Sequence, residues 1–384
     1  MGPCQGIKIV DTSRYLPGRF CTNLLADMGA EVVTVEPPSD PASKVSSVGS
    51  DTGARYLALN RNKQSITLDL NTEAGRDVFY RLISRSDAVV ESFRPGAADK
   101  MGIGYKTLGK YNPRLVYCAI SSFGQSGPYA ALPGHDLNIL SLAGVLQNDE
   151  QPCLPSSLLI GSTISSLMST IGILGALISA KETGKGQYVD VSMLDALISC
   201  LNIRATRVLR TGKDEDRSDF TDLKFPCYTT YPTKDGRRLS IGAVEPHIWK
   251  RLCRFARRPD FIDHQFDERK NDEMFSFFRE LFMTKEVDEW IAILKEHDIP
   301  CAKVNRLSEA LADEQVLHRD MVCEVDHPVL GRIKQLGIPI KYSDTPGDVS
   351  STAPLYGQDT VRILKRIGYS DSEINGFRRG GIID

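Results

Sequence analysis

Short apolar runs alternate with amphipathic stretches along the first third of the chain, and this alternation restricts the fold more than any other feature of the sequence. The apolar runs lie at residues 7–11, 31–35, 65–69, 88–91 and 115–121, and the amphipathic stretches at residues 20–28 and 73–84. Strands that alternate with helices form a mostly parallel sheet with helices packed on its faces. We therefore predict an α/β fold.

The rest of the chain continues this pattern and then changes character at a polar segment. A long helix, a strand and a second helix come first, followed by a charge-rich linker. A hairpin and several helices then indicate a smaller α+β unit, and a strand and one helix close the chain. The elements are predicted at residues 162–180, 187–191, 193–209, 228–232, 238–243, 246–256, 272–282, 287–297, 308–313, 333–340 and 359–368, and the linker at 211–223.

Charge and residue spacing exclude several classes of function. The chain carries 47 basic and 49 acidic side chains without a long block of either sign, so no nucleic-acid-binding surface is predicted. The weakly polar stretch at residues 158–180 is rich in serine and threonine, which indicates a buried helix and no membrane contact. The nine cysteines are scattered and no histidine has metal-ligand spacing, so no metal is predicted. The N-terminus shows no signal peptide, which predicts a cytoplasmic protein.

Two glycine-containing loops follow predicted strands, at residues 121–128 and 133–138. Neither matches the Gly-x-Gly-x-x-Gly motif or the Walker loop, so no nucleotide redox cofactor is predicted. The second loop carries His135 and Asp136, and α/β folds place their chemistry in such loops. Taken alone, the loops are better explained as turns, and His135 equally well as a structural histidine. Glu245, which precedes a predicted helix, is by itself consistent with a carboxylate that complements the helix dipole.

Seven short sequence segments, taken together, indicate a protein family far more specifically than any of these features does alone. They lie at residues 17–20 (PGRF), 25–33 (LADMGAEVV), 59–63 (LNRNK), 91–96 (ESFRPG), 122–128 (SFGQSGP), 134–138 (GHDLN) and 183–187 (TGKGQ). With them, nearly the whole chain resembles the class III CoA-transferases, also called the carnitine dehydratase and bile-acid-inducible protein family. This family includes formyl-CoA transferases and α-methylacyl-CoA racemases.

The resemblance implies a particular architecture. A Rossmann-like large domain would comprise residues 1–200 and 330–384, so that the C-terminal tail completes it. Residues 201–224 would form a linker, residues 225–317 the small α+β domain, and residues 318–329 the return linker. Two such chains would thread through each other as an interlocked homodimer.

The chain is most similar to the racemase branch of the family. Its Gly-His-Asp loop and its Gly242-Ala-Val-Glu-Pro246 turn imply that His135 is an acid/base residue and that Glu245 orients it. One departure from the family pattern concerns the aspartate that precedes the long helix, which is the nucleophile of the transferases and the second acid/base residue of the racemases. The corresponding residue here is Gly161, or Ser162 after a shift of one position.

Neither Gly161 nor Ser162 is a carboxylate, so another group has to take the place of the aspartate. The candidates are Asp136, a water molecule held by Ser162, and the upstream carboxylates of Asp149 and Glu150. Racemisation needs two acid/base groups at the α-carbon, and transferase chemistry needs a carboxylate that becomes an acyl anhydride.

The resemblance also implies a ligand, the thioester of coenzyme A. We expect backbone groups to make most of the contacts and Lys100 to meet a phosphate. An arginine that often follows the second strand in the family is replaced by Pro37, which implies weaker or altered CoA binding. The expected CoA-binding residues are Leu16, Leu59, Asn60, Arg61, Asn62, Lys63, Ser92, Phe93, Arg94, Lys100, Gly134 and Asn138.

Three functions follow from the resemblance and its departures. The first is an enzyme that acts at the α-carbon of an acyl-CoA thioester, as racemases and epimerases do. The second is a class III CoA-transferase that moves CoA between carboxylic acids. The third is a catalytically inactive CoA-binding subunit of a heteromeric transferase, in which an aspartate-bearing paralogue does the chemistry.

Overall fold

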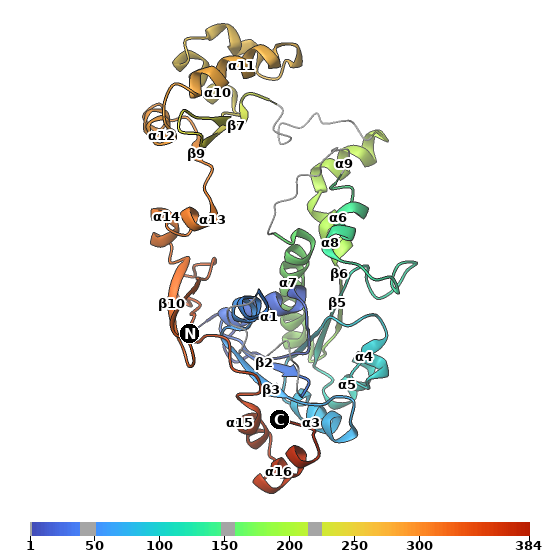
Figure 1. Cartoon of the computed structure of the whole chain (residues 1–384). Coiled ribbons are helices and arrows are strands. Elements are labelled where there is room, and N and C mark those ends of the chain that lie inside the picture. The colour runs from blue at the N-terminus through green and yellow to red at the C-terminus, as the bar shows by residue number, and fades with distance from the viewer. Residues whose placement is uncertain (1, 39–50, 147–157, 214–224) are drawn as a thin grey trace. The chain divides into compact units, whose positions relative to one another are not determined.

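The computed structural model describes residues 2–38, 51–146, 158–213 and 225–384 (Figure 1). The chain divides into two compact units, a large unit of Met1–Ala205 with His318–Asp384 and a small unit of Thr206–Leu317. The chain ends therefore both belong to the large unit.

A six-stranded sheet forms the centre of the large unit. The strands are β1 (Lys8–Asp11), β2 (Glu31–Glu36), β3 (Lys63–Thr67), β4 (Ala88–Glu91), β5 (Val116–Ser121) and β6 (Tyr188–Ser192). They pair in the order β3-β2-β1-β4-β5-β6 and every pairing is parallel. This is the strand order of a Rossmann fold, so the predicted α/β fold with a parallel sheet is confirmed.

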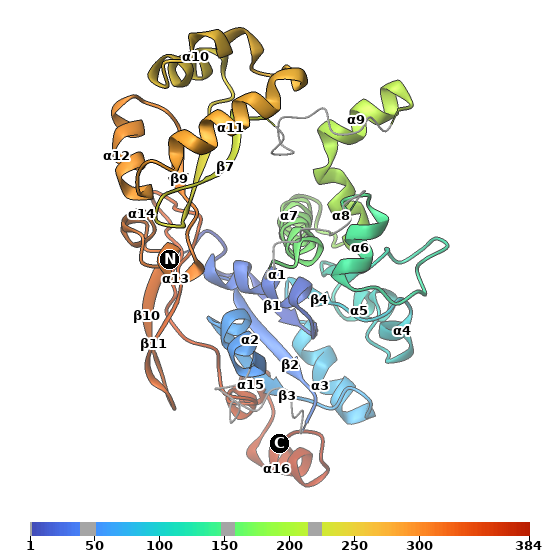
Figure 2. The same cartoon turned by 45° about the horizontal axis from the view of Figure 1, so that its top comes forward.

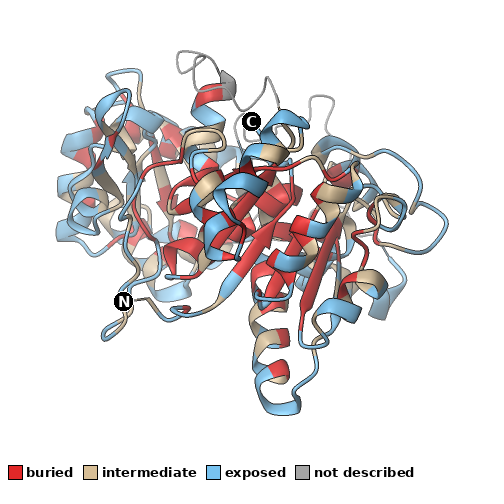
Figure 3. Ribbon diagram, turned by 90° about the horizontal axis from the view of Figure 1, so that it is seen from below, coloured by how far each residue is buried: buried red, intermediate tan, exposed pale blue. Residues whose placement is uncertain are grey.

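Helices cover both faces of the sheet, which is why its strands are the most buried segments (Figures 2 and 3). One face packs against α1 and α7, and the other against α3, α5 and the two helices of the tail. The helices of this part of the chain are α1 (Leu16–Asp27), α2 (Asp51–Asn60), α3 (Glu73–Ile83), α4 (Ala97–Lys100), α5 (Tyr105–Tyr111), α6 (Asp136–Leu142), α7 (Ile160–Thr183), α8 (Met193–Cys200) and α9 (Asn202–Thr211).

Helix α7 packs against α1 with a face of small hydroxyl side chains. Each hydroxyl donates to a backbone carbonyl three or four residues earlier in the helix, which satisfies it as a donor within α7. The residues concerned are Ser165, Ser166, Ser169 and Thr170. By length and composition α7 could also cross a membrane, but core helices of water-soluble proteins pass the same test.

The C-terminal tail returns to the large unit and covers the free edge of β3. The Ser65 N–H donates to Asp359 Oδ2 at 2.9 Å, and the Asp359 N–H donates to the Ser65 carbonyl at 2.9 Å. An exposed sheet edge would pair with other chains, so this cover protects the fold. The tail contains β10 (Val322–His327), β11 (Gly331–Leu336), α15 (Thr360–Arg366) and α16 (Asp371–Arg379).

The small unit is an antiparallel three-stranded sheet with helices packed against it. The strand order is β7-β8-β9, and the core contains many aromatic side chains, with Trp249, Phe278 and Trp290 among them. Its elements are β7 (Tyr228–Pro232), β8 (Arg238–Gly242), α10 (Pro246–Phe255), two short 3-10 helices (Pro259–His264 and Glu268–Lys270), α11 (Asn271–Phe282), α12 (Val287–Glu296), β9 (Cys301–Lys303), α13 (Leu307–Ala310) and α14 (Glu314–His318).

Several predicted elements differ from the observed ones. The strand predicted at residues 65–69 begins two residues earlier, because it includes the buried charge of Lys63. The helix predicted at residues 193–209 is two helices that meet at Leu201, a break that periodicity cannot reveal without a glycine or proline. The strand predicted at residues 333–340 is β11.

Two elements of the tail were not predicted at all. The hairpin partner β10 alternates only weakly between apolar and polar residues, because most of the hairpin is exposed. The last helix, α16, begins with a capping box in which the Ser370 hydroxyl accepts from the Glu373 N–H and the Glu373 carboxylate accepts from the Ser370 N–H. That signal was present in the sequence.

Candidate functional site

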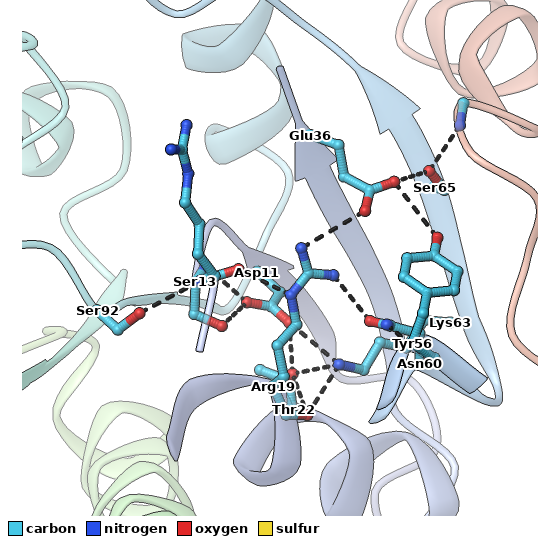
Figure 4. Close-up of polar contacts among 12 residues, drawn as sticks. Asp11, Ser13, Arg19, Thr22, Glu36, Tyr56, Asn60, Lys63, Ser65 and Ser92 are labelled. Atoms are coloured by element: carbon cyan, nitrogen blue, oxygen red, sulfur yellow. Dashed lines mark hydrogen bonds and ion pairs between the residues drawn. The ribbon is translucent and has the colours of Figure 1, made fainter. Parts of the chain in front are cut away.

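The crevice between the carboxyl ends of β1 and β4 is where a Rossmann sheet binds its ligands, because the strand order reverses there. Two loops leave the sheet at this point, and hydrogen bonds join them to each other and to the sheet. The Thr12 N–H and hydroxyl donate to the Val90 carbonyl at 2.9 and 3.0 Å. The Arg14 N–H donates to the Ser92 hydroxyl at 3.3 Å (Figure 4). The loops after β1 and β4 are therefore held in place at this end of the sheet.

Both strands end in a buried carboxylate that shapes the loop after it. Asp11 Oδ1 accepts from the Ser13 N–H at 2.9 Å and from its hydroxyl at 2.5 Å, and Glu91 Oε2 accepts from the Phe93 N–H at 2.6 Å. Burial raises the pKa of Glu91 to about 7, and the nearby carboxylates of Asp99 and Asp190 add to the effect.

The pKa of Asp11 shifts in the opposite direction. Burial opposes ionisation of Asp11, but the adjacent charges of Lys63 and Arg19 outweigh burial and lower its pKa. Lys63 Nζ lies 3.1 Å from Asp11 Oδ2, and neither side chain is exposed to solvent. Burial lowers the pKa of Lys63 to about 8, against the attraction of Asp11.

Arg19 extends this buried network toward α2 and β2 (Figure 4). Its Nε donates to the Ser13 carbonyl at 2.8 Å, and its Nη1 donates to Asn60 Oδ1 at 2.8 Å. Its Nη2 lies 3.5 Å from the Glu36 carboxylate, which is itself only 1% exposed. One polar network therefore connects the loop after β1, the end of β2 and the turn before β3.

The residues predicted to bind CoA lie in and around this network. Leu16 begins α1, Leu59 and Asn60 end α2, and residues 92–94 follow β4. The side chains of Arg94 and Lys100 are exposed and have no ion pair or hydrogen bond with another described residue. Their cationic groups are therefore available to an anion.

Other side chains of the predicted CoA-binding set are already bonded within the protein. The Arg61 guanidinium pairs with the Asp27 carboxylate at 2.7 Å. Asn62 Oδ1 accepts from the N–H groups of Ser350 and Ser351, both at 3.0 Å. Asn138 Oδ1 accepts from the His135 N–H at 3.0 Å. At these positions the side chains are engaged within the protein.

The two glycine-containing loops lie against each other next to the crevice, after β5. The Ser122 hydroxyl donates to the Gly134 carbonyl at 3.0 Å. A Cβ at Gly134 would lie 2.9 Å from the Ser122 Cβ, so only glycine allows this close approach. The packing holds His135 at the N-terminus of α6, where its side chain is exposed.

Asp136 reaches the N-terminus of α7. Its Oδ1 accepts from the Ser162 N–H at 2.7 Å, and a Cβ built on Gly161 would lie 3.2 Å from the same oxygen. The first turn of a helix leaves its N–H groups unpaired, and Asp136 satisfies one of them from a different helix. A carboxylate therefore lies beside the residue that stands where the family aspartate is expected.

Glu245 belongs to the other unit. It is the residue before α10, and its side chain is exposed. His135 lies in the large unit and Glu245 in the small unit. The expectation that Glu245 orients His135 therefore stays a prediction. Asp149 and Glu150 lie outside the described residues.

The buried network is the feature that sequence reasoning missed. Asp11, Arg19 and Thr22 were not singled out, although all three are buried and bonded to each other or to Lys63. The sequence did contain a signal for this network. Charged residues lie inside segments that are otherwise apolar, and charged residues are rarely buried without a partner. Among the described residues, no group of three or more His, Cys, Asp or Glu side chains is placed to hold a metal ion.

Comparison with known proteins shows which family the chain is similar to. The family model described as CoA-transferase family III matches residues 4–360. The chain is 34% identical to human alpha-methylacyl-CoA racemase, over 99% of the chain and 97% of that protein. It is 32% identical to an acyl-CoA transferase of Fusarium pseudograminearum, over 100% of the chain and 88% of that protein.

A solved structure agrees with the fold. A CAIB/BAIF family protein from Brucella suis superposes with a TM-score of 0.83 at 27% identity, over 95% of the chain and 99% of that protein. The similarity therefore extends through almost the full length of both chains.

Proposed function

Because the chain belongs to CoA-transferase family III, we propose that it binds an acyl-CoA thioester and catalyses proton transfer at the carbon α to the thioester carbonyl, as a racemase or epimerase does. Family members are CoA-transferases and racemases, so enzymatic activity is expected of the chain. The relative with 34% identity is named as a racemase.

The observation that carries this proposal is the position of Asp136. It follows His135 directly, and its carboxylate lies beside Gly161 at the start of α7. Two different acid/base groups, an imidazole and a carboxylate, thus belong to adjacent residues of one loop. Racemisation requires one group to remove the α-proton and another to deliver a proton to the opposite face. We assign these roles to His135 and Asp136.

The crevice between β1 and β4 is the proposed CoA site. Ordered backbone groups in the loops after both strands support this assignment, as does the exposed ammonium of Lys100. The net charge of −2 gives the protein no long-range attraction for the phosphates of CoA, so local cations have to hold them.

A CoA-transferase is the second candidate, and the same carboxylate supports it. Transfer requires a carboxylate that attacks the thioester, forms an acyl anhydride and is then converted to a CoA thioester. Asp136 is the carboxylate beside Gly161, and one relative is named as an acyl-CoA transferase. If Asp136 cannot reach the thioester carbon, the chain would be the inactive subunit of a heteromer.

The outer face of α7 supports a proposal about assembly. Leu167, Ile171 and Ile178 lie on one stripe of the helix and are 43%, 63% and 64% exposed. Large apolar side chains grouped on one face usually mark a contact surface. We propose that a second copy of the chain covers this stripe in a homodimer.

One experiment separates the candidate functions. The pure protein is incubated with acyl-CoA thioesters that carry an α-methyl group, in deuterated water, with and without an acceptor carboxylic acid. A racemase incorporates deuterium at the α-carbon without acceptor, whereas a transferase forms a new thioester only with acceptor. Absence of both reactions, together with measurable CoA binding, would contradict catalysis and leave the inactive-subunit function.

A further inference from the structure

We propose that Lys63 is a positioning residue of the CoA site, which holds the loop after β1 against the segments before β3 so that both can contact one CoA molecule. This inference rests on the proposed function, because it assumes that the crevice binds CoA. Lys63 itself touches no ligand in this account. It acts through Asp11, Thr22 and the backbone of Arg19.

The ammonium group of Lys63 has three donors, and each has an acceptor inside the protein. Nζ donates to Asp11 Oδ2 at 3.1 Å, to the Arg19 carbonyl at 2.9 Å and to the Thr22 hydroxyl at 2.8 Å. The acceptors belong to β1 and α1, which flank the loop of residues 12–15. Lys63 is therefore bound on both sides of that loop (Figure 4).

Asp11 transmits this constraint into the loop itself. Its Oδ2 accepts from Lys63 and from the Thr22 hydroxyl, which lies 2.6 Å away, while its Oδ1 accepts from the Ser13 N–H and hydroxyl. Each carboxylate oxygen of Asp11 therefore accepts two hydrogen bonds. The loop conformation thus depends on a carboxylate that stays ionised because Lys63 lies beside it.

The network reaches each of the three segments expected to contact CoA. Lys63 and Asn60 belong to the segment around the end of α2, and the loop after β1 leads to Leu16. The third segment begins at Ser92, whose hydroxyl accepts from the Arg14 N–H. Segments that are distant in sequence are thereby fixed relative to one another before a ligand arrives, which reduces the entropy lost on binding.

A buried ion pair is a poor choice if stability alone is required. Removing two charges from water costs more than the pair regains unless every donor and acceptor is satisfied, and apolar replacements are often as stable. Asp11 and Lys63 have side chains that are 0% exposed. A role in holding a specific loop geometry explains why a charged pair occupies this position.

The charged and titratable groups that face Lys63 come from β1 and α1. Asp11 favours the ammonium form, Arg19 opposes it, and Cys21 lies close enough to interact. Loss of the Lys63 proton would release Asp11 and relax the loop. In proteins that contain Lys63, the affinity for CoA is therefore expected to fall as the pH rises through about 8. A variant without Lys63 should not show this fall.

The test compares CoA binding by titration calorimetry in four proteins from pH 6.5 to 9. They are the wild type, the charge-neutral double variant Asp11→Asn/Lys63→Met, the near-isosteric variant Thr22→Val, and the control Lys8→Met. Lys8 is the first residue of β1, so it lies at the end of the strand opposite to Asp11, and its side chain is exposed. Its removal should therefore leave CoA affinity unchanged. CoA has groups that gain or lose protons over this pH range. Because every protein binds the same ligand, this effect cancels when the affinity of a variant is divided by that of the wild type at the same pH.

We expect the double variant to bind CoA about tenfold more weakly at pH 7, and the difference to shrink toward pH 9. Thr22→Val, a single near-isosteric change that serves as the test if the double variant does not fold, should show a smaller loss of affinity. Equal affinity of these variants and the wild type, or a ratio between the wild type and the double variant that does not vary with pH, would overturn the positioning role. A wild-type protein that does not bind CoA at any pH would overturn the proposed CoA site and the positioning role with it.

Discussion

Asp136 accepts a hydrogen bond of 2.7 Å from the backbone N–H of Ser162, so the first turn of α6 and the first turn of α7 are joined through one carboxylate. The residue before Ser162 is Gly161, whose missing side chain leaves room for that carboxylate. The departure from the family pattern and the position of Asp136 are therefore parts of the same local structure.

Replacement of Asp136 by Asn should abolish most α-exchange while the fold is kept. The amide oxygen can still accept from the Ser162 N–H, but the amide cannot exchange protons with the substrate. We expect α-deuteration of a 2-methylacyl-CoA to slow by about 100-fold or more, measured by mass spectrometry. Asp136→Ala should in addition lose about 1 kcal/mol of stability, since α7 loses its partner.

The control for Asp136 is Asp195→Asn. Asp195 lies in the first turn of α8 and outside the proposed site. Unchanged deuteration in Asp136→Asn would remove this carboxylate from the reaction and leave a water molecule held by Ser162 as the second group.

His135→Gln should remove α-exchange and leave stability unchanged. The imidazole is exposed, so the free energy of unfolding should stay within about 0.5 kcal/mol of the wild type. Urea denaturation and the deuteration assay measure the two effects. His318→Gln, an exposed histidine in α14, should change neither, and full exchange in His135→Gln would refute the acid/base assignment.

A carboxylate introduced at Gly161 should restore the family arrangement only if Asp136 is neutralised. The new Cβ would lie 3.2 Å from Asp136 Oδ1, so Gly161→Asp alone would place two carboxylates together and raise the pKa of one of them. We expect Gly161→Asp/Asp136→Asn to exceed Asp136→Asn in α-exchange or to gain CoA transfer. Hydroxylamine trapping detects an acyl-enzyme in the double variant, and its presence in the wild type would contradict a mechanism in which Asp136 acts only as an acid/base group.

The apolar stripe of α7 yields a prediction about assembly. Ile171→Asp places a charge in the centre of the proposed dimer contact and should convert the dimer to monomers, detected by light scattering after size exclusion. Lys110→Asp on α5, which packs on the other face of the sheet, should leave the dimer intact. A wild-type monomer at micromolar concentration would show that this stripe has another role.

The parallel sheet was predictable because its strands are nearly continuous apolar runs that need no knowledge of distant contacts. The strand at residues 88–91 was located exactly for this reason. The network around Lys63 was harder to predict, because it joins residues 52 positions apart and its only signal was the presence of charged residues inside otherwise apolar segments. A buried lysine also makes its strand look too polar, which displaced the predicted start of β3.

The site was partly predictable from the sequence. The glycine-containing loop after a strand drew attention to His135 and Asp136, and the family resemblance then made them candidate site residues. The bond from Ser162 to Asp136 spans 26 positions, and only the packing of α6 against α7 brings the two together. Sequence spacing could name Asp136 as one of several candidates, but it could not place the carboxylate at Gly161.

Glu91 provides a prediction for stability as a function of pH. Burial raises its pKa in the folded protein to about 7 from an ordinary value of 4.5, so the folded state binds this proton more tightly than the unfolded state does. The stability that the protonated carboxyl contributes is fully present below pH 4.5 and is lost as the pH rises through 7. The loss should approach about 3 kcal/mol at pH 8, from a shift of roughly two units or more.

Glu91→Gln keeps the size of the side chain and an oxygen for the Phe93 N–H, but it cannot ionise. We therefore expect the variant to be more stable than the wild type at pH 8 and to have similar stability at pH 5, by urea denaturation at several pH values. Glu182→Gln, an exposed glutamate in α7, should follow the wild-type curve throughout. If Glu91→Gln instead parallels the wild type from pH 5 to pH 8, the carboxyl of Glu91 does not hold its proton in the folded state.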